Sequence, residues 1–233
     1  MSYLAMYLDA PLQSWGYQSR FDRRTTLSFP TRSGVIGLIA ASLGIDRIDE
    51  EGLGQLSALS MVTYAFPSPI HRYHGVEYAI IPNRLHDYQT VGGGYDKKTQ
   101  RQKITRTADG NVGNTVVTHR DYLQHARFGV VLGAEEPLLT RVANALQNPV
   151  YGLWLGRKAC IPASPVFQGV YESATEALDH LIHRAGTEPA RVIEEVDSLE
   201  EDTELLMDEP VNFRNRTFNQ RRIRERSYPP DPE

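Results

Sequence analysis

The segment FPTRSGVIGLIAASLG, residues 29–44, predicts a buried helix around which the rest of the chain can be arranged. Its aliphatic residues supply a buried face, while its glycines and alanines leave room for a neighbouring backbone. Thr31 or Ser33 is placed to cap the first turn, and Gly44 is placed to end the helix. We therefore expect a core helix whose N-terminus, with Arg32, forms a small polar and basic mouth.

The mouth of this helix has two interpretations. Backbone N–H groups without intrahelical partners, together with Arg32, suit a phosphate or the backbone of a nucleic acid. Alternatively, Thr31 is only a cap and Arg32 is a solvated side chain. Arg20, Arg23 and Arg24 lie shortly before the helix and concentrate positive charge at its N-terminus, unless they belong to a solvated loop. Taken alone, the helix favours the second interpretation.

The elements on either side of this helix predict an α+β fold. Strands are expected at residues 2–8, 60–66, 77–81, 126–132 and 150–155, and further helices at 136–146 and 174–184. Up to residue 155 this order is that of a ferredoxin-like (RRM-like) domain, although the aromatic sheet motif of RNA-recognition domains is missing. We expect that domain to span residues 1–170 and a small C-terminal extension to span residues 171–233.

An insertion from about residue 83 to 125 interrupts the predicted domain. It is polar and rich in glycine, and its two β-prone flanks predict a long projecting hairpin, or thumb. Between Arg84 and Arg127 there are eight basic and four acidic residues, with three tyrosines among them. This composition is typical of an arm that grips a phosphate backbone or lies against single-stranded bases, and a solvated surface hairpin is the alternative.

The composition limits where and with what the protein acts. A single cysteine among 233 residues, Cys160, excludes an internal disulfide and a cysteine-based zinc site. No apolar run approaches the roughly 20 residues of a membrane span, and no basic leader precedes the first apolar segment. We therefore expect a cytoplasmic protein that does not enter a membrane.

The formal net charge of −4 hides an uneven distribution of charge. Residues 194–209 hold nine acids and no Lys or Arg, so the remainder of the chain would carry +5. We expect the acidic segment to be solvated. Six arginines follow it between residues 214 and 226, and they favour either RNA or the acidic segment as their partner.

Two further loops carry candidate contacts. Trp15 lies in a turn-rich loop, where it either anchors the loop on the core or stacks on a base. Arg157 and Lys158 follow the predicted strand 150–155, and a glycine and two prolines stiffen the loop around them. Adjacent bases in a rigid loop suit a fixed phosphate contact.

Several separate motifs carry a family resemblance, and they occur in colinear order from Tyr3 to Gly169. They are Tyr3-Leu4, Pro11–Gly16, Phe29–Gly34 with the following Gly37-Leu38 and Leu43–Ile45, His86–Val91, His119–Leu123 and Leu155–Pro162. Together they resemble the CasD (Cas-five type) subunits of type I-E CRISPR Cascade complexes.

The resemblance implies a crRNA-binding, non-catalytic subunit that needs neither a metal nor another cofactor. It implies a ferredoxin-like body with a thumb, bound to the repeat-derived 5′ handle of the guide RNA. The implied protein partners are the Cascade backbone subunit and the large PAM-reading subunit, through which target DNA is met indirectly. The candidate RNA contacts are Gln13, Ser14, Trp15, Arg23, Arg24, Thr31, Arg32, Ser33, Gly34, His86, Tyr88, Thr90, His119, Arg120, Tyr122, Arg157 and Lys158.

The main alternative is a metal-independent endoribonuclease that processes CRISPR repeat RNA. Similar type I-C proteins cut their own repeat RNA with a tyrosine, a lysine and a histidine, which act as acid, base and cation. The arm offers His86 and His119 beside Tyr88, but Arg120 stands where a lysine–histidine pair is expected. An adaptor that binds protein alone would explain the acidic segment and leave the arginine clusters unexplained.

Overall fold

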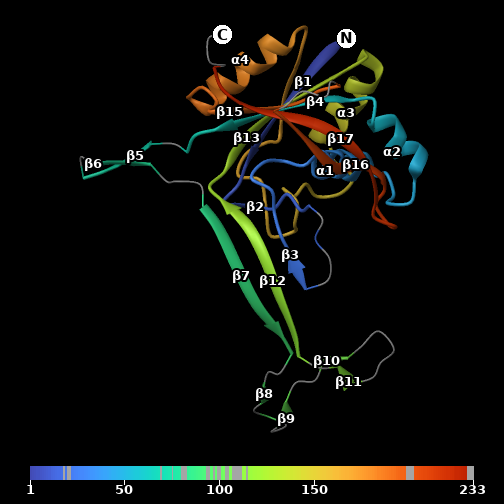
Figure 1. Ribbon diagram of the computed structural model, residues 1–233, viewed down its shortest axis with the longest axis vertical. Helices are drawn as coiled ribbons and strands as arrows, with labels where there is room; N and C mark the ends of the chain where they lie inside the picture. Colours follow the sequence, from blue (N-terminus) through green and yellow to red (C-terminus); the bar gives the residue numbers. More distant parts are fainter. Residues whose placement is uncertain are drawn as a thin grey trace.

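The computed structural model describes residues 1–17, 19, 22–68, 70–74, 76–79, 83–92, 95–96, 98, 101–102, 105–106, 112–113, 115–197 and 202–229. It consists of a body of sheet and helices, from which a long arm and a shorter hairpin project (Figure 1). The N-terminus lies on the side of the body away from the arm.

The body is built on a seven-stranded sheet in the order β14-β1-β13-β4-β15-β17-β16. Every neighbouring pair in it is antiparallel. Its strands are β1 (Ser2–Asp9), β4 (Ser60–Phe66), β13 (Arg127–Ala134), β14 (Phe167–Tyr171), β15 (Arg191–Glu195), β16 (Thr203–Asn212) and β17 (Thr217–Ser227). The last three strands come from the C-terminal part of the chain, which therefore continues the sheet of the N-terminal part.

Helices cover both faces of the sheet. The helices are α1 (Arg32–Leu43), α2 (Glu50–Leu56), α3 (Glu136–Gln147) and α4 (Ala174–Ala185). Leu4, Met6 and Leu8 of β1 point into the larger core with α1 and α3, and Ala5 and Tyr7 point into a smaller core with α4. Alternate side chains of one strand are thus buried on opposite faces, as the pattern of residues 2–8 predicts. None of these helices is long and apolar enough to cross a membrane.

Helix α1 begins and ends as the sequence predicts. The Thr31 side chain accepts a hydrogen bond from the Gly34 amide at 3.2 Å, and Gly44 ends the helix with φ of 74°. A Cβ atom on Gly34 would lie 2.8 Å from the Trp15 ring, so a glycine here lets the indole pack against the helix. The small residues of α1 therefore make room for side chains as well as for backbone.

We call residues 83–124 the arm. Its stem pairs β7 (Asn83–Val91) with β12 (Val116–Gln124) over nine residues on each strand. Short strands β8 (Tyr95–Asp96), β9 (Arg101–Gln102), β10 (Thr105–Arg106) and β11 (Val112–Gly113) lie at its far end. At its root, β2 (Leu12–Gln13) and β3 (Arg23–Arg24) add to β12. The stem is thus a hairpin joined to the body through the loop that carries Trp15.

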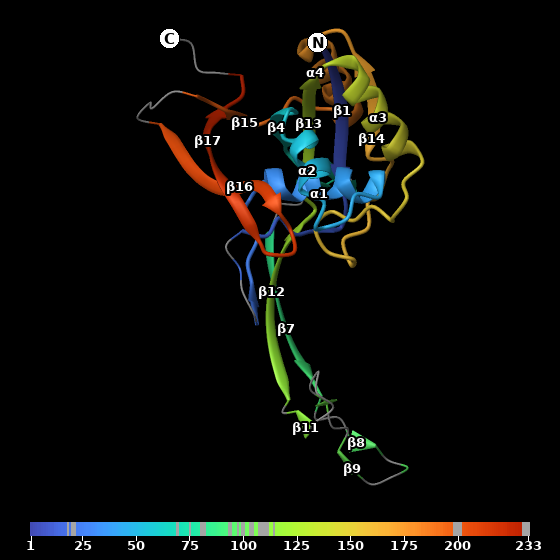
Figure 2. The same cartoon turned by 90° about the vertical axis from the view of Figure 1, so that its right-hand side faces the viewer.

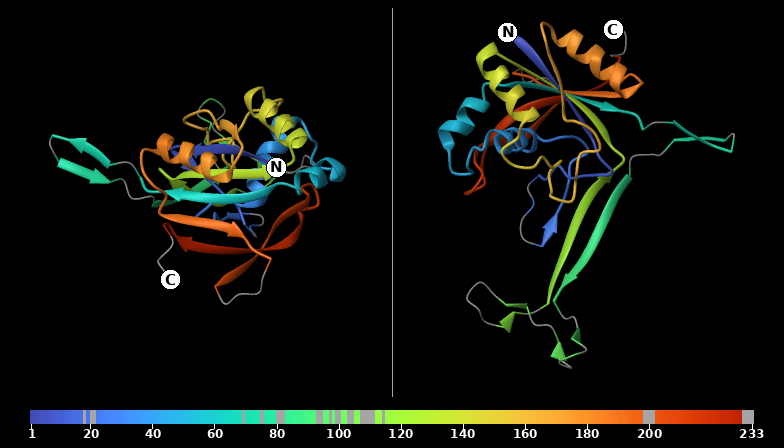
Figure 3. Two further views of the ribbon diagram at one scale, coloured as in Figure 1. Left: turned by 90° about the horizontal axis from the view of Figure 1, so that it is seen from above. Right: turned by 180° about the vertical axis from the view of Figure 1, so that it is seen from behind.

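Two predicted strands of the main sheet are absent from it. Strand β6 (Val76–Ala79) pairs with β5 (Ile70–Tyr73) in a hairpin that stands apart from the body (Figure 3), because β15 occupies the free edge of β4. The prediction of a strand at 77–81 in the sheet is therefore wrong for its described part, and residues 80 and 81 lie outside the described residues.

The expected strand at 150–155 is also wrong. The amides of Val150 and Tyr151 donate to carbonyls at the end of α1, those of Ser42 at 3.0 Å and Ala41 at 3.3 Å. These hydrogen bonds hold the segment against α1, and β14 takes the place beside β1. The fourth strand of the predicted domain therefore comes later in the chain than expected.

The acidic segment is not solvated as a whole, which corrects the expectation for residues 194–209. Asp208 is 1% exposed, and the Arg221 guanidinium donates to both of its oxygens at 2.6 and 2.9 Å. Arg224 and Arg226 also pair with acids of this segment. Described arginines of the C-terminal group thus stabilise the β15–β17 strands, which run along one side of the body (Figure 2).

Arg32 is part of the same network and is 3% exposed. Its guanidinium donates to Glu195 at 2.8 Å and to the Leu59 carbonyl at 2.7 Å, and it forms an ion pair with Glu209. Its backbone amide donates to Asp208 at 2.8 Å, so a carboxylate already occupies the N-terminus of α1. Burial raises the pKa values of the Glu195 and Glu209 carboxyls, and the charge of Arg32 opposes this shift.

We expect Arg32→Ala to lower the free energy of unfolding by about 3–5 kcal/mol, because it leaves buried carboxylates without their cation. Arg47→Ala is the matched control, since Arg47 is exposed one turn beyond the helix, and we expect a change within about 0.5 kcal/mol. Urea denaturation of the full chain measures both. Equal effects would contradict the role given to the network.

Candidate nucleic-acid interface

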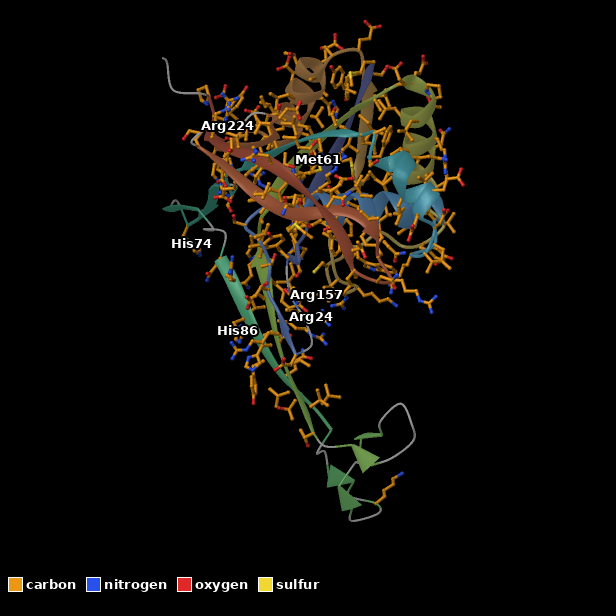
Figure 4. The ribbon with its side chains drawn as sticks, turned by 45° about the vertical axis from the view of Figure 1, so that its right-hand side comes forward. Arg24, Met61, His74, His86, Arg157 and Arg224 are labelled. Atoms are coloured by element: carbon orange, nitrogen blue, oxygen red, sulfur yellow. The ribbon has the colours of Figure 1, made fainter. Side chains whose placement is uncertain are left out.

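A groove of about 1010 Å³ lies where the arm meets the body. Four arginines line it, and they come from separate elements: Arg24, Arg120, Arg157 and Arg216. Arg24 and Arg157 lie near each other at the root of the arm (Figure 4). Tyr17, Met207, Phe213 and Phe218 form an apolar wall of the same groove. The groove therefore combines positive charge with aromatic surface.

The pairing of β3 with β12 aligns two of these arginines. The strands are parallel, and Arg24 is the register partner of Arg120. Register partners point to the same face of a sheet, so both guanidinium groups lie on the face that lines the groove. Arg24 is held further by a hydrogen bond from Nη1 to the Ser19 carbonyl at 3.3 Å.

Arg157 is positioned by backbone carbonyls and by an aromatic ring. It donates to the carbonyls of Arg24 at 2.9 Å and Asp121 at 3.3 Å, and its guanidinium lies 4.7 Å from the centre of the Tyr122 ring. The preceding Gly156 has φ of 99°, and a Cβ atom there would fall 1.7 Å from the Ser14 carbonyl oxygen. Only glycine allows the loop to approach this closely, so the loop holds Arg157 in place.

The electrostatics of the groove favour an anion. Partial burial, followed by the charges of Arg216, Arg157 and Arg120, lowers the pKa of Arg24 below its ordinary value. Within the described part of the chain, no ion pair joins any of these four arginines to a carboxylate. Asp208 also lines the groove, but its carboxylate is paired with Arg221. The repulsion among the four arginines is therefore relieved when a phosphate binds between them.

Several predicted contacts are instead structural. Gln13 and Trp15 are fully buried: the Gln13 amide donates to the carbonyls of Leu8 and Ala126, and the indole N–H donates to Gln13 Oε1 at 3.1 Å. Trp15 therefore anchors its loop on the core and has no free face for a base. Thr31 is buried as the cap of α1.

The remaining residues of the helix mouth divide between core and groove. Arg32 is buried in ion pairs, so the structure does not support its expected contact with phosphate. Gly34 packs against Trp15, whereas Ser33 is partly exposed and lines the groove. Ser14 also lines it, although the side chain is 3% exposed and donates to the Asp121 carbonyl.

The predicted arm residues lie on two faces of the stem. Arg120 lines the groove, and Tyr122 shares its face of β12 but is buried beside Arg157, whereas His119 lies on the opposite face. His86 and Tyr88 oppose Asp121 and His119 across the strands and share their face. Thr90 lies on the exposed outer part of β7, Arg23 is exposed beside His119 on β3, and Lys158 is exposed beside Trp154.

The sequence did not single out part of the groove. Arg216 was one of six arginines near the C-terminus; it lies in the turn between β16 and β17, whereas Arg221, Arg224 and Arg226, which pair with acids, lie on β17. Tyr17 lies far from Phe213 and Phe218 in the chain, and nothing in the sequence indicated that the three residues share a site. Folding of the β16–β17 hairpin over α1 brings them together.

Comparison with known proteins identifies the class and then the family. The model of a family described as CRISPR-associated protein (Cas_Cas5) matches residues 3–226. The chain is thus a CRISPR-associated protein, and it belongs to the Cas5 family. Over 176 residues it is 30% identical to the CRISPR system Cascade subunit CasD of Escherichia coli (strain K12), which covers 74% of this chain and 73% of that protein.

Solved structures agree with this assignment. A chain of a CRISPR RNA-guided surveillance complex has a TM-score of 0.72 and 27% identity, covering 97% of this chain and 89% of that one. A second, described as the crystal structure of a Cas protein, has a TM-score of 0.65 and 29% identity, covering 99% and 98% of the two chains. The mixed α/β fold with its large antiparallel sheet is therefore shared with these proteins.

Proposed function

We propose that this protein is a non-catalytic crRNA-binding subunit of a type I CRISPR Cascade complex that acts in antiviral defence. The repeat-derived 5′ handle of the guide RNA would lie in the groove at the root of the arm. The observation that carries the proposal is the convergence of Arg24, Arg120, Arg157 and Arg216 in one groove. Because the chain belongs to the Cas5 family of CRISPR-associated proteins, we infer that the bound RNA is the CRISPR guide RNA.

The two walls of the groove suit the two parts of a single-stranded nucleotide. Guanidinium groups donate paired hydrogen bonds to phosphate oxygens, which holds the backbone. Aromatic side chains such as Tyr17 and Phe213 offer surfaces on which bases can stack without regard to their identity. The protein would thus hold the shape of the handle, while base pairing of the guide reads the target.

The proposed role requires protein partners. Because similar chains are subunits of Cascade and of a CRISPR RNA-guided surveillance complex, we propose contacts with the backbone subunit and with the large PAM-reading subunit. Target DNA would be met indirectly through these partners. The role would place the protein in the cytoplasm, away from a membrane, as its single cysteine and the lack of a long apolar run led us to expect.

We also propose that β1, α1, β4, β13, α3 and β14 form a ferredoxin-like core. Their order along the chain is β-α-β-β-α-β, and the strands lie in the sheet order β14-β1-β13-β4. The arm then interrupts the segment between β4 and β13, and strands β15, β16 and β17 of the C-terminal extension enlarge the sheet. This arrangement puts the groove where the core, the arm and the extension meet.

One observation favours a second candidate function, a metal-independent endoribonuclease that cuts repeat RNA. His86 Nδ1 lies 2.7 Å from Asp121 Oδ1, and His86 Nε2 lies 3.0 Å from His119 Nδ1. A carboxylate joined to imidazoles in this way can orient a general base. Arg24 and Arg120 lie on the other face of the stem, so this chain of groups does not line the groove.

We expect Arg24→Gln and Arg120→Gln each to weaken binding of repeat-derived RNA by about 10- to 100-fold, because each substitution removes one charged hydrogen bond to phosphate. Each should also reduce the slope of log Kd against log salt by about 0.7, because one fewer counterion is released. Fluorescence anisotropy of the full chain across a salt series measures both. Arg141→Gln, at an exposed site on α3, is the control and should change neither.

Two results would contradict the groove assignment. One is an Arg141→Gln effect as large as that of Arg120→Gln, which would mean that RNA responds only to overall charge. The other is equal affinity for a repeat-derived RNA and for a shuffled RNA of the same length and composition in the assembled complex.

The rival function predicts cleavage of repeat RNA at one position in the presence of EDTA, and loss of that cleavage in His119→Ala. Our proposal predicts that the RNA stays intact with the wild-type protein and with His119→Ala under these conditions. Gel analysis of end-labelled RNA distinguishes the two. Cleavage that persists in His119→Ala would point to a contaminating ribonuclease and would support neither function.

A further inference from the structure

A group of titratable side chains lies on the face of the arm that turns away from the groove. We call Asp121, His86, His119 and Tyr88 the histidine face. They form two adjacent cross-strand pairs, His86 with Asp121 and Tyr88 with His119. Figure 4 shows His86 on the arm, on the side away from Arg24 and Arg157. None of these four side chains lines the groove.

Hydrogen-bond donors and acceptors fix the protons of the neutral imidazoles. An ionised carboxylate only accepts, so His86 Nδ1 carries the proton that Asp121 receives at 2.7 Å. His86 Nε2 is then an acceptor when the ring is neutral, and His119 Nδ1 must donate to it at 3.0 Å. The remaining nitrogen, His119 Nε2, then carries no proton and can only accept a hydrogen bond.

Uptake of one proton reverses the role of this nitrogen. If the charge resides on His119, its Nε2 carries a proton while Nδ1 still donates to His86. If the charge resides on His86, that ring donates from Nε2, His119 Nδ1 accepts, and His119 Nε2 again carries the proton. Both arrangements keep the two hydrogen bonds, so His119 Nε2 changes from acceptor to donor without movement of the rings.

The surroundings of the pair suit an anion once the proton is bound. The His86 side chain is 57% exposed, whereas the Asp121 side chain is 16% exposed and sits behind it as the counter-charge. On β3, Arg23 is the register partner of His119 and adds a positive charge at the surface. On β7, Arg84 lies two residues from His86 on the same face. These are the charged groups that the packed strands bring to this face.

An aromatic ring completes the site. Tyr88 is 59% exposed, and its ring meets that of His119 edge to face with 5.1 Å between centroids. Its open face can take a base next to a phosphate held by His119. His119 can therefore donate to a phosphate while the adjacent Tyr88 ring stacks on a base of the same nucleotide.

We propose that the histidine face is a second phosphate-binding site for the guide RNA, which binds a backbone phosphodiester only after the imidazole pair has taken up one proton. The inference rests on the proposed function, because it needs RNA along the arm. The groove arginines hold RNA at any pH, and the histidine face adds a contact that strengthens as the pH falls. RNA would then contact both faces of the stem.

The test compares Kd for repeat-derived RNA between pH 8.5 and 5.5 at constant ionic strength, with the full chain and with His119→Gln. Relative to the variant, the wild-type protein should gain up to about tenfold in affinity per pH unit as the pH falls, because binding is linked to one proton, and the gain should level off once the pair is protonated in the free protein. His183→Gln, exposed on α4, is the control and should follow the wild type.

The outcomes separate this inference from the proposed function. Parallel pH profiles for wild type and His119→Gln, with RNA bound by both, would overturn the second site and leave the arginine groove intact. Absence of RNA binding by the wild type at every pH would overturn both. Circular dichroism of each variant checks that the arm substitutions leave the fold unchanged.

Discussion

The ion network around Arg32 is the interaction on which the arrangement of this protein depends. Arg32 and Arg221 share Glu195, Asp208 and Glu209 between them, and these five groups join the N-terminus of α1 to the C-terminal strands. Burying such charges costs free energy, and the network offsets that cost only when every partner is present. It therefore fixes the position of the β16–β17 hairpin against α1.

That position determines what the groove can bind. The hairpin contributes Phe213, Phe218 and Arg216 to one wall, while β3, β12 and the loop after Gly156 contribute the other arginines. Because Asp208 already meets the N-terminus of α1, an external phosphate has no access to the first amide of the helix. The positive charge available to RNA therefore lies at the root of the arm and not at the N-terminus of α1, where the sequence predicted it.

Local patterns predicted much of the fold, and long-range charge pairing accounts for most of what they missed. The alternation in β1, the caps of α1 and the β-prone flanks of the arm depend on neighbours in sequence and were correct. Glu195, which pairs with Arg32, lies 163 residues away in the sequence. No local pattern distinguishes an acid in a buried ion pair from one in a solvated acidic run. The apolar run from 150 to 155 predicted a strand, yet its amides bond to α1. Family motifs located the arm and Arg157, but they could not separate buried Trp15 from exposed Tyr88.

The most direct measurement is ultraviolet cross-linking of the assembled complex, followed by mass spectrometry of the RNA-linked peptides. Aromatic rings stacked on bases react readily, and Tyr17, Phe213 and Phe218 line the groove. Our account predicts adducts on the peptides that carry these residues. Adducts confined to α3 and α4, with none on the groove, would contradict it.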